Sequence, residues 1–172
     1  MLLSGAEAER AGRLRFEDDR VRWTHARSAL RSVLARYAGD TPESLCFVYG
    51  AQGKPALSPP RDIEFNLSHA GDWALIAVAK FVPVGVDIER IRENVDIAAL
   101  LRRLGESNLP QAVPDLYKAW TRREARSKAV GGAIFDPPDA DARVLDLDAP
   151  EGYAAAVALL GYEPRVTRRT ES

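Results

Sequence analysis

Residues 84–89 read VGVDIE, and the alternation of apolar and acidic side chains in this segment predicts a β-strand. Successive side chains on a strand point to opposite faces, so Asp87 and Glu89 share one face about 7 Å apart, while Val86 and Ile88 point into a core. Two carboxylates placed in this way can approach one hard cation such as Mg²⁺, which typically keeps water and phosphate oxygens as its other ligands. Taken alone, the pattern favours the simpler interpretation of a half-exposed strand whose acids face water.

A second motif, WTRREARSKA, occupies residues 120–129. Proline is tolerated in the first turn of a helix and glycine ends one, so Pro114 and the glycines at 131 and 132 predict a helix over residues 114–130. Trp120, Glu124 and Lys128 lie at i, i+4 and i+8 along one face of that helix. Taken alone, this spacing favours a surface ion pair between Glu124 and Lys128.

The third motif is FNLSH at residues 65–69. His25 and His69 are the only histidines in the chain, so a metal site built from several histidines is excluded. Ser68 and His69 are neighbours whose side chains diverge on an extended segment, and the chain has no G-x-S-x-G elbow, which disfavours a serine hydrolase. A donor role towards a phosphate is the better interpretation of this pair.

The remaining pattern predicts alternating short elements. Apolar residues at i, i+3, i+4 and i+7 predict a helix over residues 19–37, ended by Gly39. Strands are expected at 44–49, at 73–79 (buried on both faces) and at 143–147, a short helix at 97–104, and a linker at Pro137 and Pro138. Residues 153–156 fit a strand or a helix. Cys46 is expected to be an inert, buried thiol.

The composition limits the classes of function. The 172 residues carry a net charge of −1, so no bulk attraction to nucleic acid or to a membrane is expected. One cysteine allows neither an intrachain disulfide nor a zinc site built on cysteines. No apolar stretch approaches the roughly 20 residues that span a bilayer, and no signal peptide is recognised. We expect a soluble, cytoplasmic protein.

The three motifs in this order resemble the Sfp-type 4′-phosphopantetheinyl transferases. That family shows an F-N-x-S-H stretch, an apolar strand, G-x-D-x-E, and then W-x-x-K-E-A-x-x-K-A; here they read FNLSHAGD (65–72), VGVDIE (84–89) and WTRREARSKAVGG (120–132). Gly53-Lys54-Pro55 is similar to an upstream segment of the family. The helix at 19–37 and the tail at 144–159 also resemble it, so the likeness runs from about residue 10 to residue 168.

The resemblance implies an α+β fold of two pseudo-twofold-related halves, each a small antiparallel sheet with a packed helix. Residues 1–82 would form the half that binds the adenine and 3′-phosphate of coenzyme A. Residues 83–172 would form the half with the metal site and the side that faces the carrier. Family members usually begin with an extra strand before the region that matches residue 5, and this chain lacks it.

The resemblance also implies an enzyme of the holo-[acyl-carrier-protein] synthase type, which moves phosphopantetheine from coenzyme A to a serine of an apo acyl, polyketide or peptidyl carrier protein. Adenosine 3′,5′-bisphosphate would be released. Mg²⁺ would be held by Asp87, Glu89 and Glu124, with Lys128 on the same phosphates and Glu124 as the base. The implied coenzyme A contacts are Lys54, Ser68, His69, Arg22 and Arg15.

The segment between Glu89 and Trp120 is compressed relative to the family, and residues 100–104 (LLRRL) replace its F-F-x-x-x-E run, in the region that normally helps to receive the carrier. The lysine before the helix glutamate is Arg123, which keeps the charge but changes the hydrogen-bond geometry. Two alternatives stay open: a shortened homologue that binds coenzyme A or a carrier without catalysis, and a phosphate- or nucleic-acid-binding module that uses the arginines of residues 10–36. A monomer is favoured and a dimer is possible.

Overall fold

The computed structural model of the chain describes residues 2–132, 141–161 and 167. Its elements are α1 (Gly5–Gly12), α2 (Glu17–Ala38), β1 (Cys46–Tyr49), β2 (Pro55–Ser58), β3 (Ile63–Ala70), β4 (Trp73–Lys80), β5 (Val84–Arg90), α3 (Ile97–Arg103), α4 (Val113–Val130), β6 (Ala142–Leu147) and β7 (Tyr153–Leu160). They form antiparallel sheets in the orders β1-β2, β3-β4 and β5-β7-β6. The expected α+β class is therefore confirmed, while the pseudo-twofold relation of the halves stays a prediction.

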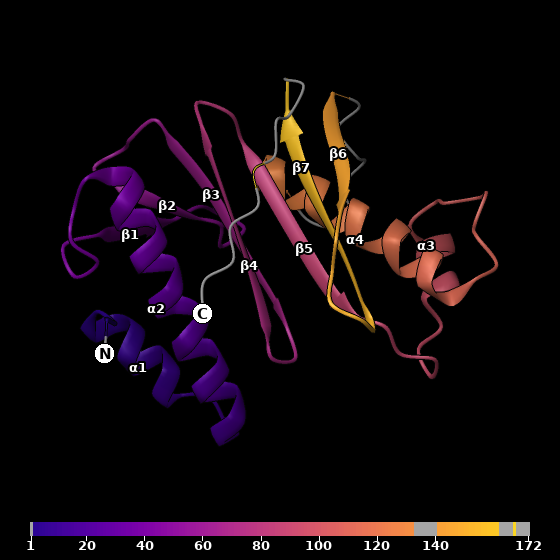
Figure 1. Cartoon of the computed structure of the whole chain (residues 1–172), viewed down its shortest axis with the longest axis horizontal. Helices are drawn as coiled ribbons and strands as arrows, with labels where there is room; N and C mark the ends of the chain where they lie inside the picture. Colours follow the sequence, from indigo (N-terminus) through magenta and orange to yellow (C-terminus); the bar gives the residue numbers. More distant parts are fainter. Residues whose placement is uncertain (1, 133–140, 162–166, 168–172) are drawn as a thin grey trace.

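Figure 1 shows how these elements are arranged. Helices α1 and α2 and strands β1 and β2 lie at one end, β3 and β4 lie beside β5, and α3 lies at the other end. Helix α4 packs against the β5-β7-β6 sheet. The break predicted after residue 82 falls between β4 and β5, which lie side by side in the middle of the molecule.

Helix α2 holds the core of the first half. Its residues Leu30 and Leu34 are fully buried and pack with Leu45, which precedes β1, and with Leu57 of β2 and Phe65 of β3. The helix extends the predicted segment by a residue or two at each end and stops at Gly39, whose φ of 70° supplies the left-handed C-cap. This part of the sequence prediction is confirmed.

Helix α1 was not predicted, although Ser4 and Glu7 form a capping box at its start. The Glu7 carboxylate is buried and accepts hydrogen bonds from the Nε atoms of Arg27 and Arg31 on α2, the second at 2.7 Å. Burial raises the pKa of Glu7, but the hydrogen bonds from Ser4, Arg27 and Arg31 outweigh it and lower that pKa overall. This buried charge cluster fixes α1 on α2.

In the second half, small side chains let α4 approach the sheet closely. Ala125 and Ala129 of α4 pack on Ala156 and Ala158 of β7. A Cβ atom on Gly85 would lie 2.1 Å from the Ala125 carbonyl oxygen, so only glycine fits there. The alanines at 154–156, which fitted either kind of element, belong to strand β7.

Side chains join the two halves along one edge of β5. Asn66 and Ser68 on β3 accept hydrogen bonds from the backbone N–H groups of Val86 (2.9 Å) and Ile88 (3.3 Å). The Lys54 ammonium donates to the carbonyl of Val84 at 3.2 Å. Because residues 84, 86 and 88 alternate on the strand, their backbone groups face the same edge. We call this row of three side chains the seam.

Two predictions about burial were wrong. Strand β4 contacts a core cluster on each face, through Ile76 and Val78 on one and Leu75 and Ala77 on the other, but it is only partly buried and its first residue, Trp73, is exposed. Cys46 is exposed as well: its neighbours Leu45 and Phe47 point inward, so the alternation of the strand turns the thiol outward. The predicted linker at Pro137 and Pro138 lies outside the described residues. In the described part of the chain, no helix is long and apolar enough to cross a membrane.

Candidate active site

The central residue of the candidate site is Asp87, which lies in the middle of β5 and is only 2% exposed. One of its carboxylate oxygens, Oδ1, accepts hydrogen bonds from Ser68 Oγ at 2.9 Å and from Lys128 Nζ at 2.5 Å. The other, Oδ2, is buried and has no hydrogen-bond partner among the residues that the structure describes. A buried carboxylate oxygen without a donor is costly unless something else binds it.

Two further carboxylates, Glu89 and Glu124, are half-buried near Asp87. Burial raises the pKa of Glu89, and the negative charges of Asp87 and Glu124 raise it further. Burial also raises the pKa of Glu124; Lys128 opposes that shift and Asp87 adds to it. Each of the three acids therefore lies within electrostatic reach of the others. Within the described residues, their side chains as placed do not form a set of three that could ligate one metal ion.

The close approach of α4 to Gly85 explains how these charges meet. Glu124 and Lys128 lie one turn apart on the helix face that crosses β5, so the lysine reaches the carboxylate of Asp87. The alternative of a surface pair between Glu124 and Lys128 is not what the structure shows, because the lysine hydrogen-bonds Asp87 and Ser68. The acids of the strand do not face water either, since Asp87 is buried.

Ser68 lies in this cluster, but its contacts differ from those expected. Its hydroxyl donates to Asp87 and accepts from the Ile88 N–H and from Lys128. Lys54 is placed on the seam: its ammonium donates to the carbonyls of Val84 and Ala129, the second at 2.9 Å. Burial lowers the pKa of Lys54.

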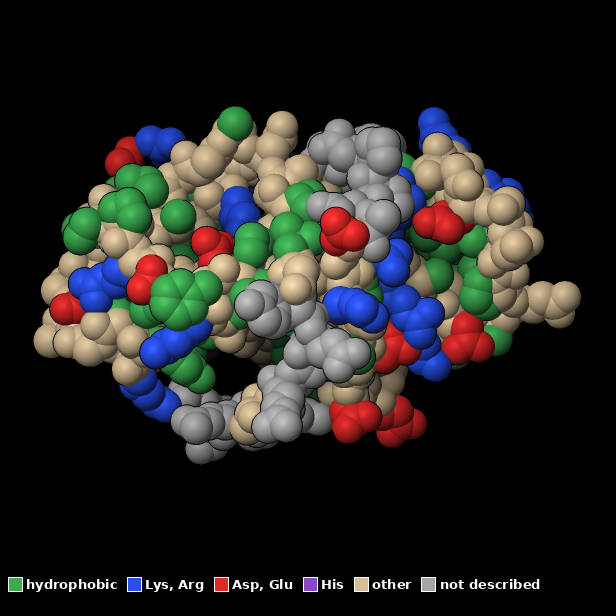
Figure 2. Space-filling view, turned by 90° about the horizontal axis from the view of Figure 1, so that it is seen from above, with side chains coloured by type: hydrophobic (Ala, Val, Ile, Leu, Met, Phe, Trp, Pro, Cys, Tyr) green, Lys and Arg blue, Asp and Glu red, His purple; other side chains and the backbone are tan. Residues whose placement is uncertain are grey.

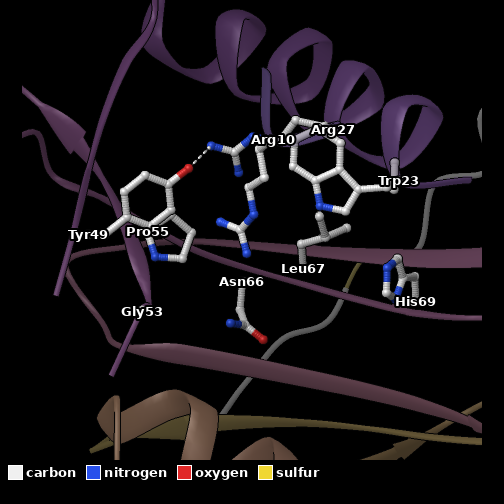
Figure 3. A pocket seen from close by; sticks show the side chains of 10 residues that line it. Arg10, Trp23, Arg27, Tyr49, Gly53, Pro55, Asn66, Leu67 and His69 are labelled. Atoms are coloured by element: carbon white, nitrogen blue, oxygen red, sulfur yellow. Dashed lines mark hydrogen bonds between the residues drawn. The ribbon is translucent and has the colours of Figure 1, made fainter. Parts of the chain in front are cut away.

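A pocket of about 170 Å³ opens on the other side of β3. It is lined by Arg10, Trp23, Ala26, Arg27, Tyr49, Gly53, Pro55, Asn66, Leu67 and His69. Figure 3 shows the Arg10 guanidinium pointing into the pocket beside the Trp23 ring; its Cζ atom lies 5.9 Å from the ring centroid. Arg27 donates to the Tyr49 hydroxyl at 2.9 Å. Two cations, an imidazole and an aromatic ring suit an anionic ligand with a flat ring.

Of the predicted coenzyme A residues, His69 lines this pocket. Lys54 stands in the sequence between the lining residues Gly53 and Pro55, and neither Arg22 nor Arg15 is a lining residue. Arg22 is exposed and donates to Asp72 at 3.1 Å, and the exposed Arg15 lies over the ring of Phe16. The sequence reasoning missed Arg10, Trp23 and Arg27. The helical period offered a signal, because Arg27 and Arg31 share the face of Leu30 and Leu34 and so had to point inward.

The arginines of residues 10–36 do not gather into one basic surface. Several are paired with acids of the same half: Arg13 with Glu9, Arg20 with Glu17, Arg22 with Asp72, and both Arg27 and Arg31 with Glu7. On the face of the molecule drawn in Figure 2, acidic and basic side chains are interspersed. This pairing weakens the alternative of a module that binds nucleic acid through these residues.

Comparison with known proteins points to one family. A family model described as 4′-phosphopantetheinyl transferase, N-terminal, matches residues 1–81. The chain is 36% identical over 144 residues to the 4′-phosphopantetheinyl transferase HetI of a Nostoc species, which covers 77% of this chain and 61% of that protein. It is 37% identical over 125 residues to the Escherichia coli 4′-phosphopantetheinyl transferase AcpT, covering 67% of this chain and 60% of the relative.

A longer but weaker match joins the chain to a 4′-phosphopantetheinyl transferase of Bacillus subtilis, with 28% identity over 170 residues, 94% of this chain and 74% of the relative. The chain thus spans about three-fifths of the length of HetI and AcpT. The motifs of residues 65–69, 84–89 and 120–129 meet in one site, as the resemblance required. The chain belongs to the 4′-phosphopantetheinyl transferase superfamily.

Proposed function

We propose that this chain is a Mg²⁺-dependent 4′-phosphopantetheinyl transferase. It would move the phosphopantetheine arm of coenzyme A to a serine hydroxyl of an apo carrier protein and release adenosine 3′,5′-bisphosphate. The observation that carries the proposal is the buried Oδ2 of Asp87, which has no partner in the described part of the chain and lies near two half-buried glutamates and a lysine. The printed names of the relatives support the same reaction class.

Carboxylate oxygens are the ligands that a hard cation prefers, although the three acids as placed in the described residues do not form a set around one ion. A buried carboxylate oxygen without a described hydrogen-bond donor, near two glutamates whose pKa values are raised by burial and by the charge of Asp87, gains from a divalent ion. Asp87, Glu89 and Glu124 would hold Mg²⁺. When bound, Mg²⁺ would neutralise charge on the pyrophosphate of coenzyme A and on the leaving bisphosphate.

The residues of the chain would promote the transfer by positioning the substrates and by their charges. Arg10, Arg27 and His69 would bind the phosphorylated adenosine end of coenzyme A in the pocket, with the Trp23 ring against the adenine. The carrier serine oxygen would bond to the phosphorus of the phosphopantetheinyl group while the bond from that phosphorus to the adenosine bisphosphate oxygen breaks. Glu124 would take the hydroxyl proton, helped by a pKa that burial raises.

The partners proposed are coenzyme A and an apo acyl, polyketide or peptidyl carrier protein, met in the cytoplasm by a monomer. Neither nucleic acid nor a membrane takes part in this proposal.

The test is direct. The purified chain is mixed with coenzyme A, Mg²⁺ and a panel of apo carriers, which are then weighed by intact mass spectrometry. We expect one carrier to gain a single phosphopantetheinyl group, and EDTA or Asp87→Asn to abolish the gain. Asp148→Asn, which changes an exposed acid just beyond β6, is the matched control and should transfer normally. Coenzyme A binding without transfer to any carrier would favour the non-catalytic homologue.

The pocket is tested separately. Arg10→Ala should raise KM for coenzyme A at least several-fold with a smaller change in kcat, because it removes a cation that points into the pocket. Arg13→Ala, which removes an exposed arginine paired with Glu9 on the same helix segment, is its control. Equal KM values for the two variants would exclude the pocket as the coenzyme A site.

A further inference from the structure

Glu7 is a buried acid on α1 whose carboxylate holds one of the arginines that line the pocket. It is 5% exposed, and its Oε1 accepts a hydrogen bond from the Nε of Arg27. Its Oε2 accepts from the backbone N–H of Ser4 at 2.8 Å and from the Nε of Arg31 at 2.7 Å. Glu7 itself is not a lining residue, so any effect of Glu7 on a ligand in the pocket must pass through the groups that it holds.

The guanidinium of Arg27 is fixed in a way that leaves one of its amino groups available. Its Nε donates to Glu7 and its Nη2 donates to the Tyr49 hydroxyl at 2.9 Å, while its Cζ lies 4.2 Å from the centroid of the Phe47 ring. No described residue accepts a hydrogen bond from Nη1, although Arg27 lines the pocket. An arginine offers five N–H donors in a rigid fork, so the two on Nη1 remain for an anion in the pocket.

Arg10, the other arginine in the pocket, depends on Glu7 through the docking of α1. The two residues are three apart on the same helix face, next to the buried Ala11. Helix α1 has eight residues, too few to be stable in water by itself, and it packs on α2 at the outer end of the molecule (Figure 1). If α1 left α2, Arg10 would be withdrawn from the pocket and from the Trp23 ring of α2.

The charges of this cluster leave a surplus that an anionic ligand would offset. One buried carboxylate, that of Glu7, faces the two buried guanidinium groups of Arg27 and Arg31. Arg10 adds a further cation at the pocket (Figure 3). A phosphate that contacted Arg10 on α1 and Arg27 on α2 would make charge-assisted hydrogen bonds to both helices and so join them.

We propose that Glu7 is a positioning residue for the phosphorylated adenosine end of coenzyme A, because it presents Arg27 directly and Arg10 by docking α1 on α2. This inference rests on the proposed function, since it assigns a role within the coenzyme A pocket described there. Ligand binding and the docking of α1 must then strengthen each other, because coupling between two binding events is reciprocal. The role needs neither the metal nor the carrier.

Hydrogen exchange of the wild-type full chain tests the coupling, with adenosine 3′,5′-bisphosphate alone as the probe. If the bisphosphate binds only while α1 is docked, exchange of the α1 amides should slow by up to about 100-fold at about 100 times its Kd. Helix α3 is the internal control, because it is a short helix at the other end of the molecule, and local opening there should be unchanged. Equal slowing in α1 and α3 would overturn the inference.

Glu7→Gln tests the carboxylate itself. We expect the Kd of the bisphosphate, measured by calorimetry, to rise at least about 10-fold, which is the loss expected from one charged hydrogen bond. With an active carrier, KM for coenzyme A should rise while kcat stays within about twofold. Glu9→Gln is the matched control, since Glu9 is an exposed glutamate of α1 paired with Arg13, and it should behave as the wild type.

A double variant separates positioning from a general loss of stability. Because Glu7 acts in part through Arg10, Glu7→Gln should weaken binding less in an Arg10→Ala background than in the wild type. Urea unfolding identifies any variant that fails to fold. If Glu7→Gln does not fold, Glu7→Asp, which keeps the charge on a shorter side chain, is compared with the wild type and should show a smaller rise in Kd.

Other results would also overturn the inference: wild-type bisphosphate affinity in folded Glu7→Gln, fully additive effects of Glu7→Gln and Arg10→Ala, or a wild-type chain that binds no bisphosphate. The proposed function fails differently. If no carrier is modified while Glu7→Gln still weakens bisphosphate binding, the positioning role stands and the transfer reaction does not.

Discussion

Gly85→Ala tests the packing that brings α4 onto β5. The added Cβ would lie 2.1 Å from the Ala125 carbonyl oxygen, 2.4 Å from the Ala129 nitrogen and 2.9 Å from the Lys128 carbonyl carbon, all of them backbone atoms that cannot rotate away. Ordinary contact begins at 3.4 Å, so the helix must move by about 3.4 − 2.1 = 1.3 Å at its tightest point. Overpacking of this kind typically costs about 1–3 kcal/mol of the free energy of unfolding.

The same movement separates the groups of the site. A shift of this size lengthens the 2.5 Å contact of Lys128 with Asp87, and a displacement of about 1 Å can cost about 100-fold in rate. Urea unfolding and the carrier mass assay measure the two effects. Gly12→Ala is the matched control, because a Cβ there meets nothing within 4 Å. A Gly85→Ala variant with wild-type stability and activity would refute the reasoning.

Three further predictions concern charged contacts. Glu7→Gln should lower the free energy of unfolding by about 3–5 kcal/mol, since it leaves two buried arginines uncompensated. Because the native pKa of Glu7 is lowered from 4.5, its contribution is present above that value and is lost as the pH falls through the native pKa. Urea midpoints measured from about pH 3 to about pH 7 should fall less on acidification in Glu7→Gln than in the wild type. Parallel pH profiles for the two proteins would contradict this. Lys54→Met should cost about 1–3 kcal/mol, because two carbonyls lose their donor; an unchanged urea midpoint would show that the seam does not need this lysine. Arg122→Ala, which removes an exposed pair with Asp146, should change the midpoint by less than about 1 kcal/mol, and a larger loss would mean that this pair ties α4 to β6.

Local periodicity was sufficient for the helices that carry a clear apolar face and for strand β5. The segments 19–37 and 114–130 were predicted within two residues at each end, because both are stopped by glycines with left-handed backbone angles. Helix α1 and strands β2 and β3 were not predicted. The signal for β3 was present in the sequence, because the core-facing Ile63, Phe65 and Leu67 alternate with Glu64, Asn66 and Ser68.

For the candidate site, too, one part could be predicted from local spacing and another part could not. The motifs at 84–89 and 120–129 fixed which residue types stand one strand step or one helix turn apart, because those spacings follow from the backbone period alone. Only the tertiary structure decided which polar atoms meet. Ser68 and Lys128 lie 19 and 41 residues from Asp87 in the chain, so a local pattern contains no information about their hydrogen bonds. Burial then set the energetics, since the close packing of α4 on Gly85 removes water from Asp87 and leaves one of its oxygens without a partner.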